Sequence, residues 1–536
     1  MITAAGCTPA TYRIWLALIV LGGLAVRFIH FSLTLGSDDQ VWVTVAREIS
    51  THAPQTDEPV YYTRIVWSWL LGLWGRIGSF SLEWTAVLMF GLSGLTTLFI
   101  AEGARSAFDP RTALIAAAAY AIHPLAVTFD TFTLPDGLAV CVLSACTWRF
   151  LHYLRTPQAR QLLVPGILIG LLFGVKNYFM LISIPCAATI LILPLPLRTR
   201  ITHAGLLAGI SSASLVFALA LGSMSGVEAT SHIVSAGNYV NYISQGSLTG
   251  QGIDDTRELV TTLIDRTRSI TVIFFSYGSV AGVLTLFGFA LSVTRCRASP
   301  AHLFLASTVT VFLMFLMWMP VRLSPLLFTQ LHERYLTVIL PALCISTGAA
   351  VAEAWQAFAT RTLRTAAACS LIAVVGYSLW IPSGLHDQYG RLEMMGVARV
   401  VADAPERGTT TLLMPAYLRR LVPDSYRDRG VQLRFVDLES PAGVTAALEG
   451  IAASANTAMY VVRTPYRTLT ERLRTGDYSN DLAAGPYAAL MNEATSHGFV
   501  ISEVRVPYDT LRVWLARAGI ATRGQLVGWV ITRPAP

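Results

Sequence analysis

The sequence predicts a polytopic α-helical membrane domain followed by a small water-soluble α/β domain. Of its 536 residues, 54% are hydrophobic and only 13% are charged, whereas soluble domains average roughly 25% charged residues. The charges are also unevenly spread, because residues 1–383 contain 39 of the 71 charged side chains and residues 384–536 contain 32. These counts exclude a soluble enzyme and place the boundary between the two domains near residue 383.

Apolar runs long enough to cross roughly 30 Å of hydrocarbon predict about eleven membrane helices. They lie at 14–34, 84–102, 111–129, 136–153, 162–175, 178–196, 204–223, 270–293, 302–320, 335–353 and 365–382. No small-residue cleavage site follows the first run, so we expect a retained membrane helix rather than a signal peptide.

Arginines in alternate short loops predict the orientation in the membrane. Arg13 precedes the first helix, and every second loop is basic, as at Arg105, Arg111, Arg198 and Arg200. Positive charge is enriched in cytosolic loops. We therefore expect a cytosolic N-terminus and, with an odd number of helices, an extracytoplasmic C-terminal domain.

Two long external loops are expected, at 35–83 and 224–269. The segment 61–78 within the first loop is apolar enough to span, but counting it would put the basic loops on the wrong side. Its three tryptophans and its terminal Arg64 and Arg76 are typical of an amphipathic helix lying in the membrane interface.

The tail at 384–536 alternates helix-like stretches with short strand-like runs, which predicts an α/β domain. The helix-like stretches are 391–404, 441–454 and 483–497, and the strand-like runs are TTLLM, VQLRFVDL, AMYVV, FVISEV and GWVIT. It has no Gly-rich phosphate loop and no hydrolase motif, so we expect it to cap the active site or bind the acceptor.

Ionisable residues converge on the expected outer face of the membrane domain. They are Asp38, Asp39, Asp130, Asp136, Lys176, Arg322, His332, Glu333 and Arg334, and Lys176 is the only lysine of the chain. Such groups near spanning helices are costly unless paired or hydrated. A carboxylate acting as a general base and cations stabilising a phosphate leaving group would suit displacement at a phosphorylated carbon, beside lipid tails.

Five segments, in order, carry a resemblance to a known family. They are Ser37–Ile49 (SDDQVWVTVAREI), Glu58–Tyr62 (EPVYY), His123–Ala139, Gly174–Tyr178 (GVKNY) and Glu333–Pro341. The chain resembles the GT-C glycosyltransferases, in the branch of the protein O-mannosyltransferases and lipid A aminoarabinose transferases. That resemblance implies a GT-C fold and inverting transfer of a sugar from a polyprenyl-phosphate donor to an acceptor, at the outer face of a bacterial inner membrane.

The resemblance also implies roles for particular residues. By position, Asp38 matches the catalytic base of the family, and Asp39 stands where the family usually has Glu. Lys176 and Arg334 would bind the lipid phosphate, with Arg64 and Arg27 as weaker candidates. Further site candidates are Glu58, Asp130, Asp136, Arg322, His332, Glu333 and Tyr335.

No cofactor is required by these residues. Oligosaccharyltransferases of the superfamily hold a divalent metal with an Asp-x-Asp motif, which is missing here, since Asp130 is followed by Asp136 six positions later. Asp38 and Asp130 would be the ligands if a metal binds, with His332 as either a further ligand or a hydrogen-bonding group.

Two other function classes stay open. A transporter or flippase for a lipid-linked or anionic solute should show internal repeats and helices broken near the midplane, and the sequence has no repeat. A non-catalytic assembly protein would not need so many spans. The partners expected are a polyprenyl-phosphate sugar and a protein, lipid or glycan acceptor, and scattered arginines argue against nucleic acid. The sugar and the acceptor stay open.

Overall fold

A computed structural model describes residues 8–29, 37–51, 64–224, 256–323, 326–328, 333–357, 376, 408–415, 431–437, 441–462, 486–507 and 525–534. The chain forms two compact units, one of residues 1–28 and 42–382 and the other of residues 29–41 and 383–536. The first is called the membrane unit and the second the α/β unit below.

The membrane unit is almost entirely helical. Its helices are α1 (Pro9–Ile29), α5 (Leu82–Ala107), α6 (Pro110–Ile122), α7 (Pro124–Phe129), α8 (Pro135–Arg155), α9 (Leu163–Val175), α10 (Ser183–Ile192), α11 (Leu197–Met224), α13 (Thr256–Arg295), α14 (Pro300–Trp318) and α15 (Leu340–Ala357), with the 3-10 turns η1 (Ala159–Leu162), η2 (Asn177–Ile182) and η3 (Glu333–Ile339). Every expected run except 365–382 overlaps helix, and that run lies outside the described residues apart from position 376.

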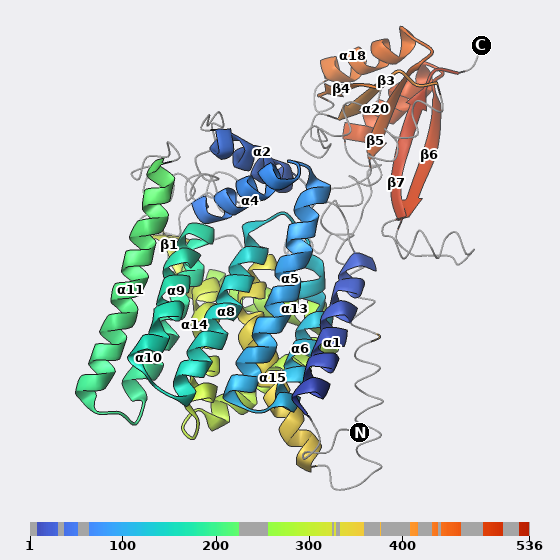
Figure 1. The fold of residues 1–536 in the computed structure, drawn as a ribbon. Helices are drawn as coiled ribbons and strands as arrows, with labels where there is room; N and C mark the ends of the chain where they lie inside the picture. Colours follow the sequence, from blue (N-terminus) through green and yellow to red (C-terminus); the bar gives the residue numbers. More distant parts are fainter. Residues whose placement is uncertain are drawn as a thin grey trace. The chain divides into compact units, whose positions relative to one another are not determined.

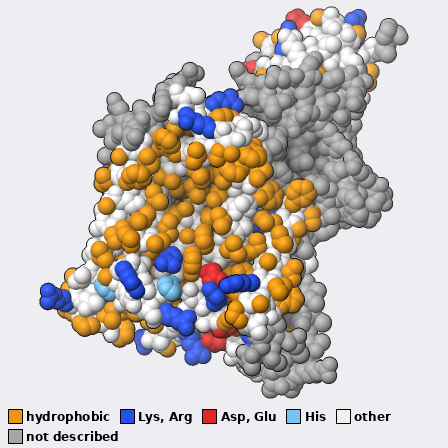
Figure 2. Space-filling model, viewed as in Figure 1, with side chains coloured by type: hydrophobic (Ala, Val, Ile, Leu, Met, Phe, Trp, Pro, Cys, Tyr) orange, Lys and Arg blue, Asp and Glu red, His pale blue; other side chains and the backbone are white. Residues whose placement is uncertain are grey.

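Six helices of the described part are long and apolar enough to cross a membrane, so the chain is a multi-span membrane protein. The count of eleven spans stays a prediction. Burial shows which helices lie at the centre of the bundle. In the most apolar 18-residue stretch of the helical segment Arg334–Ala357, which includes α15, 89% is buried, whereas in that of α11 only 11% is buried. Figure 2 shows a continuous belt of hydrophobic side chains on one face, with Lys and Arg mostly below it.

The described chain departs from regular α-helix at three places within or beside the expected spans. The run 111–129 breaks at His123 (φ −63°, ψ 125°), between α6 and α7, because Pro124 disfavours helical backbone in the residue before it. The runs 162–175 and 178–196 are separated by extended backbone at Lys176. The run 335–353 starts as the 3-10 turn η3 before α15 begins. The turns η2 and η3 both pack against α8 and α14, which brings two of these breaks together.

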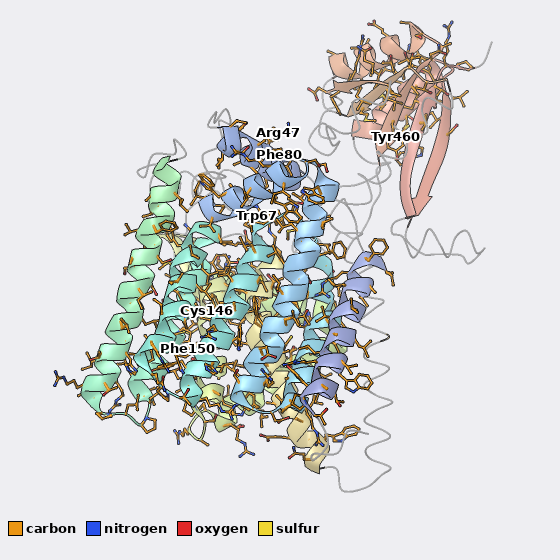
Figure 3. All side chains as sticks on the ribbon, in the orientation of Figure 1. Arg47, Trp67, Phe80, Cys146, Phe150 and Tyr460 are labelled. Atoms are coloured by element: carbon orange, nitrogen blue, oxygen red, sulfur yellow. The ribbon has the colours of Figure 1, made fainter. Side chains whose placement is uncertain are left out.

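The segment 35–83, expected as the first external loop, holds two helices, α2 (Ser37–Thr51) and α4 (Ile65–Ile77), shown above the bundle in Figure 1. Helix α4 is the expected interface helix, whereas α2 was not expected. A Cβ on Gly72 of α4 would lie 2.9 Å from the carbonyl oxygen of Ala46 in α2, so glycine allows the two helices to touch. Trp67 of α4 is fully buried. The Arg47 guanidinium of α2 lies 5.5 Å from the ring centroid of Phe80, just before α5 (Figure 3).

A pair of tryptophans joins the end of α4 to the start of α5. The indole Nε1 of Trp74 donates to the carbonyl of Trp84 at 2.8 Å, and Nε1 of Trp84 donates to the carbonyl of Trp74 at 2.9 Å. Their rings stack with centroids 4.8 Å apart and an interplanar angle of 11°. This reciprocal clamp closes the turn at Gly78, where a Cβ would run into the Trp84 ring.

The α/β unit contains a five-stranded sheet of order β4-β3-β5-β7-β6. Its strands are β3 (Thr411–Pro415), β4 (Gln432–Val436), β5 (Thr457–Val462), β6 (Val500–Pro507) and β7 (Gln525–Thr532), with helices α18 (Pro441–Ala452) and α20 (Pro486–Ser496). Strands β3, β4 and β5 are parallel, and β7 is antiparallel to both β5 and β6. Leu448, Met459 and Leu490 lie in its core. The α/β prediction is confirmed, and the expected helix at 391–404 lies outside the described residues.

Candidate active site

Lys176 lies at a break in the chain inside the membrane unit. Its backbone is extended (φ −159°, ψ 105°) between the end of α9 and the start of η2, and only 6% of the residue is exposed. The Lys176 ammonium donates to Oδ1 of Asp136, in the first turn of α8, in a buried ion pair. The pair satisfies both charges in a place where a lone charge would be costly.

Aromatic rings surround the Lys176 ammonium. Its Nζ lies 4.5 Å from the ring centroid of Tyr335 in η3, and 5.3 Å and 5.9 Å from those of Tyr178 and Phe179 in η2. The Tyr178 ring is in turn stacked on Phe315 of α14, with centroids 5.3 Å apart. Cation–π attraction favours an ammonium in this position, so ring packing between α14 and the two 3-10 turns fixes where the charge sits.

Two arginines accompany the pair. The Arg334 guanidinium lies 5.7 Å from the same Tyr335 ring, and Arg64, which precedes α4, donates to Oδ1 of Asn177. Both arginines are close enough to act electrostatically on Asp136 and Lys176. The arrangement is a cluster of three cations, Lys176, Arg64 and Arg334, around one carboxylate, with a net charge of +2 for these four described residues. We call it the Lys176 cluster.

Asn177 is a member of the site that sequence reasoning missed. The only sequence signal for it was its place directly after Lys176 in the GVKNY segment. Its side-chain oxygen accepts the Arg64 hydrogen bond, which holds the guanidinium beside the break. Asn177 therefore connects the start of the interface helix α4 to the Lys176 cluster.

A second buried ion pair joins Asp130, directly after α7, to Arg27 of α1. The Arg27 Nη2 donates to Asp130 Oδ2 at 2.8 Å, and the same oxygen accepts from the Ser93 hydroxyl at 2.9 Å. The Tyr120 hydroxyl lies 3.0 Å from Asp130 Oδ1. Arg27, which is 1% exposed, also donates to the carbonyl of Ala121 at 2.7 Å.

These contacts change two sequence-based expectations. Arg27 was a candidate for the donor phosphate and Asp130 a candidate site residue or metal ligand, but the structure pairs them with each other, and both carboxylate oxygens of Asp130 already accept hydrogen bonds. A hard cation needs several free oxygens. In the part of the chain that the structure describes, no three His, Cys, Asp or Glu residues come together, and a metal held by Asp38 and Asp130 stays a prediction.

The remaining candidates are placed only in part. Asp38 and Asp39 lie in the first turn of α2, Arg322 lies in strand β1 (Pro320–Leu323), which pairs with β2 (Leu326–Phe328), and Glu333 begins η3. The side chains of these four residues are outside the description, as are Glu58 and His332 altogether. The structure thus brings together Asp136, Lys176, Arg64, Arg334 and Tyr335, and leaves the expected base Asp38 placed by its backbone alone.

The fold and the site define a class of protein: a polytopic membrane protein with the GT-C fold and a cationic site where its helices are interrupted. Residues 57–218 match the family model described as dolichyl-phosphate-mannose-protein mannosyltransferase. This match agrees with the resemblance to the GT-C glycosyltransferases that the sequence segments carry. None of the curated protein sequences matches the chain.

Several solved structures are similar to the chain, and one of them reaches a TM-score of 0.50. The Archaeoglobus fulgidus oligosaccharyltransferase in its apo form is 11% identical with a TM-score of 0.50, covering 85% of this chain and 70% of that one. A second structure of it, tethered to an acceptor peptide, is 13% identical with a TM-score of 0.49, covering 80% of this chain; the chain spans only 64% of its length. ArnT from Cupriavidus metallidurans in the apo state is 13% identical with a TM-score of 0.49, covering 97% and 98% of the two chains.

Proposed function

We propose that this protein is a membrane glycosyltransferase that moves a sugar from a polyprenyl-phosphate donor to an acceptor, with inversion at the anomeric carbon. The observation that carries the proposal is the Lys176 cluster, which gathers three cations around one carboxylate at interrupted helices. Excess cationic charge among apolar helices suits a lipid-linked phosphate. The match of residues 57–218 to the dolichyl-phosphate-mannose family supports the same donor class.

The proposed reaction is a single displacement. Asp38, in the first turn of α2, takes the proton of the acceptor hydroxyl while that oxygen attacks the anomeric carbon. The bond between this carbon and the phosphate oxygen breaks, and its electron pair stays on the phosphate. The products are the glycosylated acceptor and the polyprenyl phosphate. Asp39 follows Asp38 and stands as a second acidic group of the same turn.

The cations act on the leaving group. The phosphate carries about one more negative charge after the bond breaks than before, so cations near it stabilise the transition state more than the bound donor. We assign this task to Lys176 and Arg334, which share the Tyr335 ring. Arg64 assists from the position in which Asn177 holds it.

The site faces the extracytoplasmic side in this proposal. The basic loops put the N-terminus in the cytosol of a bacterial cell, with the protein in the inner membrane and the α/β unit outside. The acceptor is a protein, lipid or glycan on that side. The chain's sequence and fold favour no particular sugar, and a transporter or flippase gains no support from the relatives.

The decisive experiment is transfer by purified protein in proteoliposomes, followed as release of polyprenyl phosphate from a panel of polyprenyl-phosphate sugars. Asp38→Asn should lower transfer by about 10²–10⁴-fold while the protein still inserts and elutes as a single species. The matched control is Asp109→Asn, because Asp109 caps α6 at the opposite end of the bundle and asparagine caps equally well. If the Asp38→Asn variant transfers sugar at the rate of the wild type, Asp38 is not the base. Repeating the wild-type assay with a chelator tests whether transfer needs a metal.

A further inference from the structure

We infer that Asp136 is a charge-balancing residue that allows the spent polyprenyl phosphate to leave the site, an inference that rests on the proposed function. In the proposed reaction Lys176, Arg334 and Arg64 all stabilise a phosphate, and among the described residues Asp136 is the carboxylate that forms an ion pair with Lys176. It does not touch the reacting atoms. It acts through the ion pair, as a positioning residue for the Lys176 ammonium.

The need for such a residue follows from the charges of substrate and product. The donor is a phosphodiester with one negative charge, whereas the polyprenyl phosphate product is a monoester with a charge of about −1.5 to −2 near pH 7. Cations that stabilise the leaving group therefore also hold the product more tightly than the donor. Without an opposing charge, the Lys176 cluster would bind its own product best and turn over slowly.

Asp136 is placed to limit this effect. Its carboxylate is 4% exposed and pairs with the ammonium directly, and it lowers the charge of the cluster from +3 to +2. A phosphate that enters competes with Asp136 for Lys176, and Asp136 recovers the ammonium when the phosphate departs. The rings of Tyr335, Tyr178 and Phe179 keep the ammonium within reach of both partners.

Neutralising Asp136 should therefore favour the product over the donor. Coulomb energy is proportional to the charge of the ligand, so one added positive charge shifts the binding free energy of a dianion about twice as much as that of a monoanion. If Asp136→Asn strengthens binding of a phosphomonoester by ~10-fold, it should strengthen binding of a diester by only ~3-fold. The ratio of the two dissociation constants should change by ~3-fold, and turnover should fall through product inhibition.

The test compares two probes that differ in one ester bond: undecaprenyl phosphate and its methyl diester. Their dissociation constants are measured for the full-length protein in detergent at pH 8, where the monoester is a dianion. The inference predicts that Asp136→Asn raises the preference for the monoester by ~3-fold. An unchanged or reduced preference, or equal weakening of both probes, would overturn it. A merely structural role for Asp136 would weaken both probes and leave their ratio alone.

Further variants keep the test informative if Asp136→Asn does not fold. The double variant Lys176→Gln/Asp136→Asn has the same net charge as the wild type and leaves no ion of this pair without a partner. Its preference for the monoester over the diester should therefore match that of the wild type. The single variant Lys176→Gln should show a lower preference for the monoester. Equal preferences in these two variants would also overturn the inference. Asp109→Asn should leave the preference unchanged. A wild-type protein that binds neither probe would instead overturn the proposed function, and this inference with it.

Discussion

The two buried ion pairs of the membrane unit are similar in kind and different in surroundings. Both carboxylates flank one short segment, since Asp130 follows α7 and Asp136 begins α8. Asp130 is enclosed by Arg27, Ser93 and Tyr120, so its hydrogen-bonding capacity is used within the protein. Asp136 instead shares Lys176 with a set of rings and lies near two further cations.

The comparison separates a pair that is enclosed within the protein from a pair that we propose to be functional. Among the described residues, both oxygens of Asp130 accept hydrogen bonds and its charge is matched by that of Arg27, so the pair holds α1 and α5 to the segment that leads into α8. Among the described side chains, the Lys176 cluster has three cations and one carboxylate, an imbalance that an incoming anion would relieve. We therefore base the proposed site on this surplus of positive charge rather than on buried charge alone.

The largest effect is expected from breaking the Asp130 pair. Arg27→Met should lower the free energy of unfolding by about 3–5 kcal/mol, because it leaves the Asp130 carboxylate buried without a cation. Unfolding titrated with SDS in detergent measures this change. The double variant Arg27→Met/Asp130→Leu should recover most of the loss. Equal instability of the single and double variants would contradict a pairwise origin of the effect.

An intermediate effect, on transfer rather than stability, is expected from Lys176→Arg. The charge is kept, but the guanidinium is wider than an ammonium and must fit among rings whose nearest centroid lies 4.5 Å from Nζ. We expect donor kcat/KM to fall by ~10–100-fold, or about 1.4–2.8 kcal/mol, with a smaller change in unfolding. Near-normal donor affinity and turnover would show that the identity of this cation does not matter.

The smallest effect is expected from Tyr335, whose ring contacts both Lys176 and Arg334. Tyr335→Leu removes cation–π attraction of about 0.5–1 kcal/mol, so the KM for the donor should rise a few-fold. Tyr335→Phe keeps the ring and is the matched control, with a KM near that of the wild type. If both variants raise KM equally, the hydroxyl rather than the ring is what the site uses.

The sequence predicted the membrane helices well because each apolar run carries its own signal. It did not predict α2, although Trp42, Val45, Ala46 and Ile49 recur at helical spacing and are all buried. These four apolar residues are separated by polar ones, and the whole segment is too polar to be identified as a membrane helix. The strands of the α/β unit were found because short β-branched runs there are separated by turns.

The sequence predicted most members of the candidate site, but it missed Asn177 and did not predict which residues pair. The basic loops predicted that Asp130, Asp136, Lys176 and Arg334 lie on one side of the membrane. Such local patterns do not predict which of these side chains contact one another. The Arg27–Asp130 pair joins residues 103 positions apart, and no local rule says which of two nearby aspartates faces which cation. The break at His123 has a local signal in Pro124, whereas the extended backbone at Lys176 has no such signal in the sequence beside it.

The Trp74–Trp84 clamp gives the protein an optical signature. Two stacked indoles with centroids 4.8 Å apart couple their electronic transitions, so the circular dichroism of the stacked pair should differ from that of two separated tryptophans. Both indole N–H groups are held by carbonyls, so the rings stay parallel only while the α4–α5 turn is closed. The circular dichroism of this tryptophan pair therefore reports whether the α4–α5 turn is closed, without an added label.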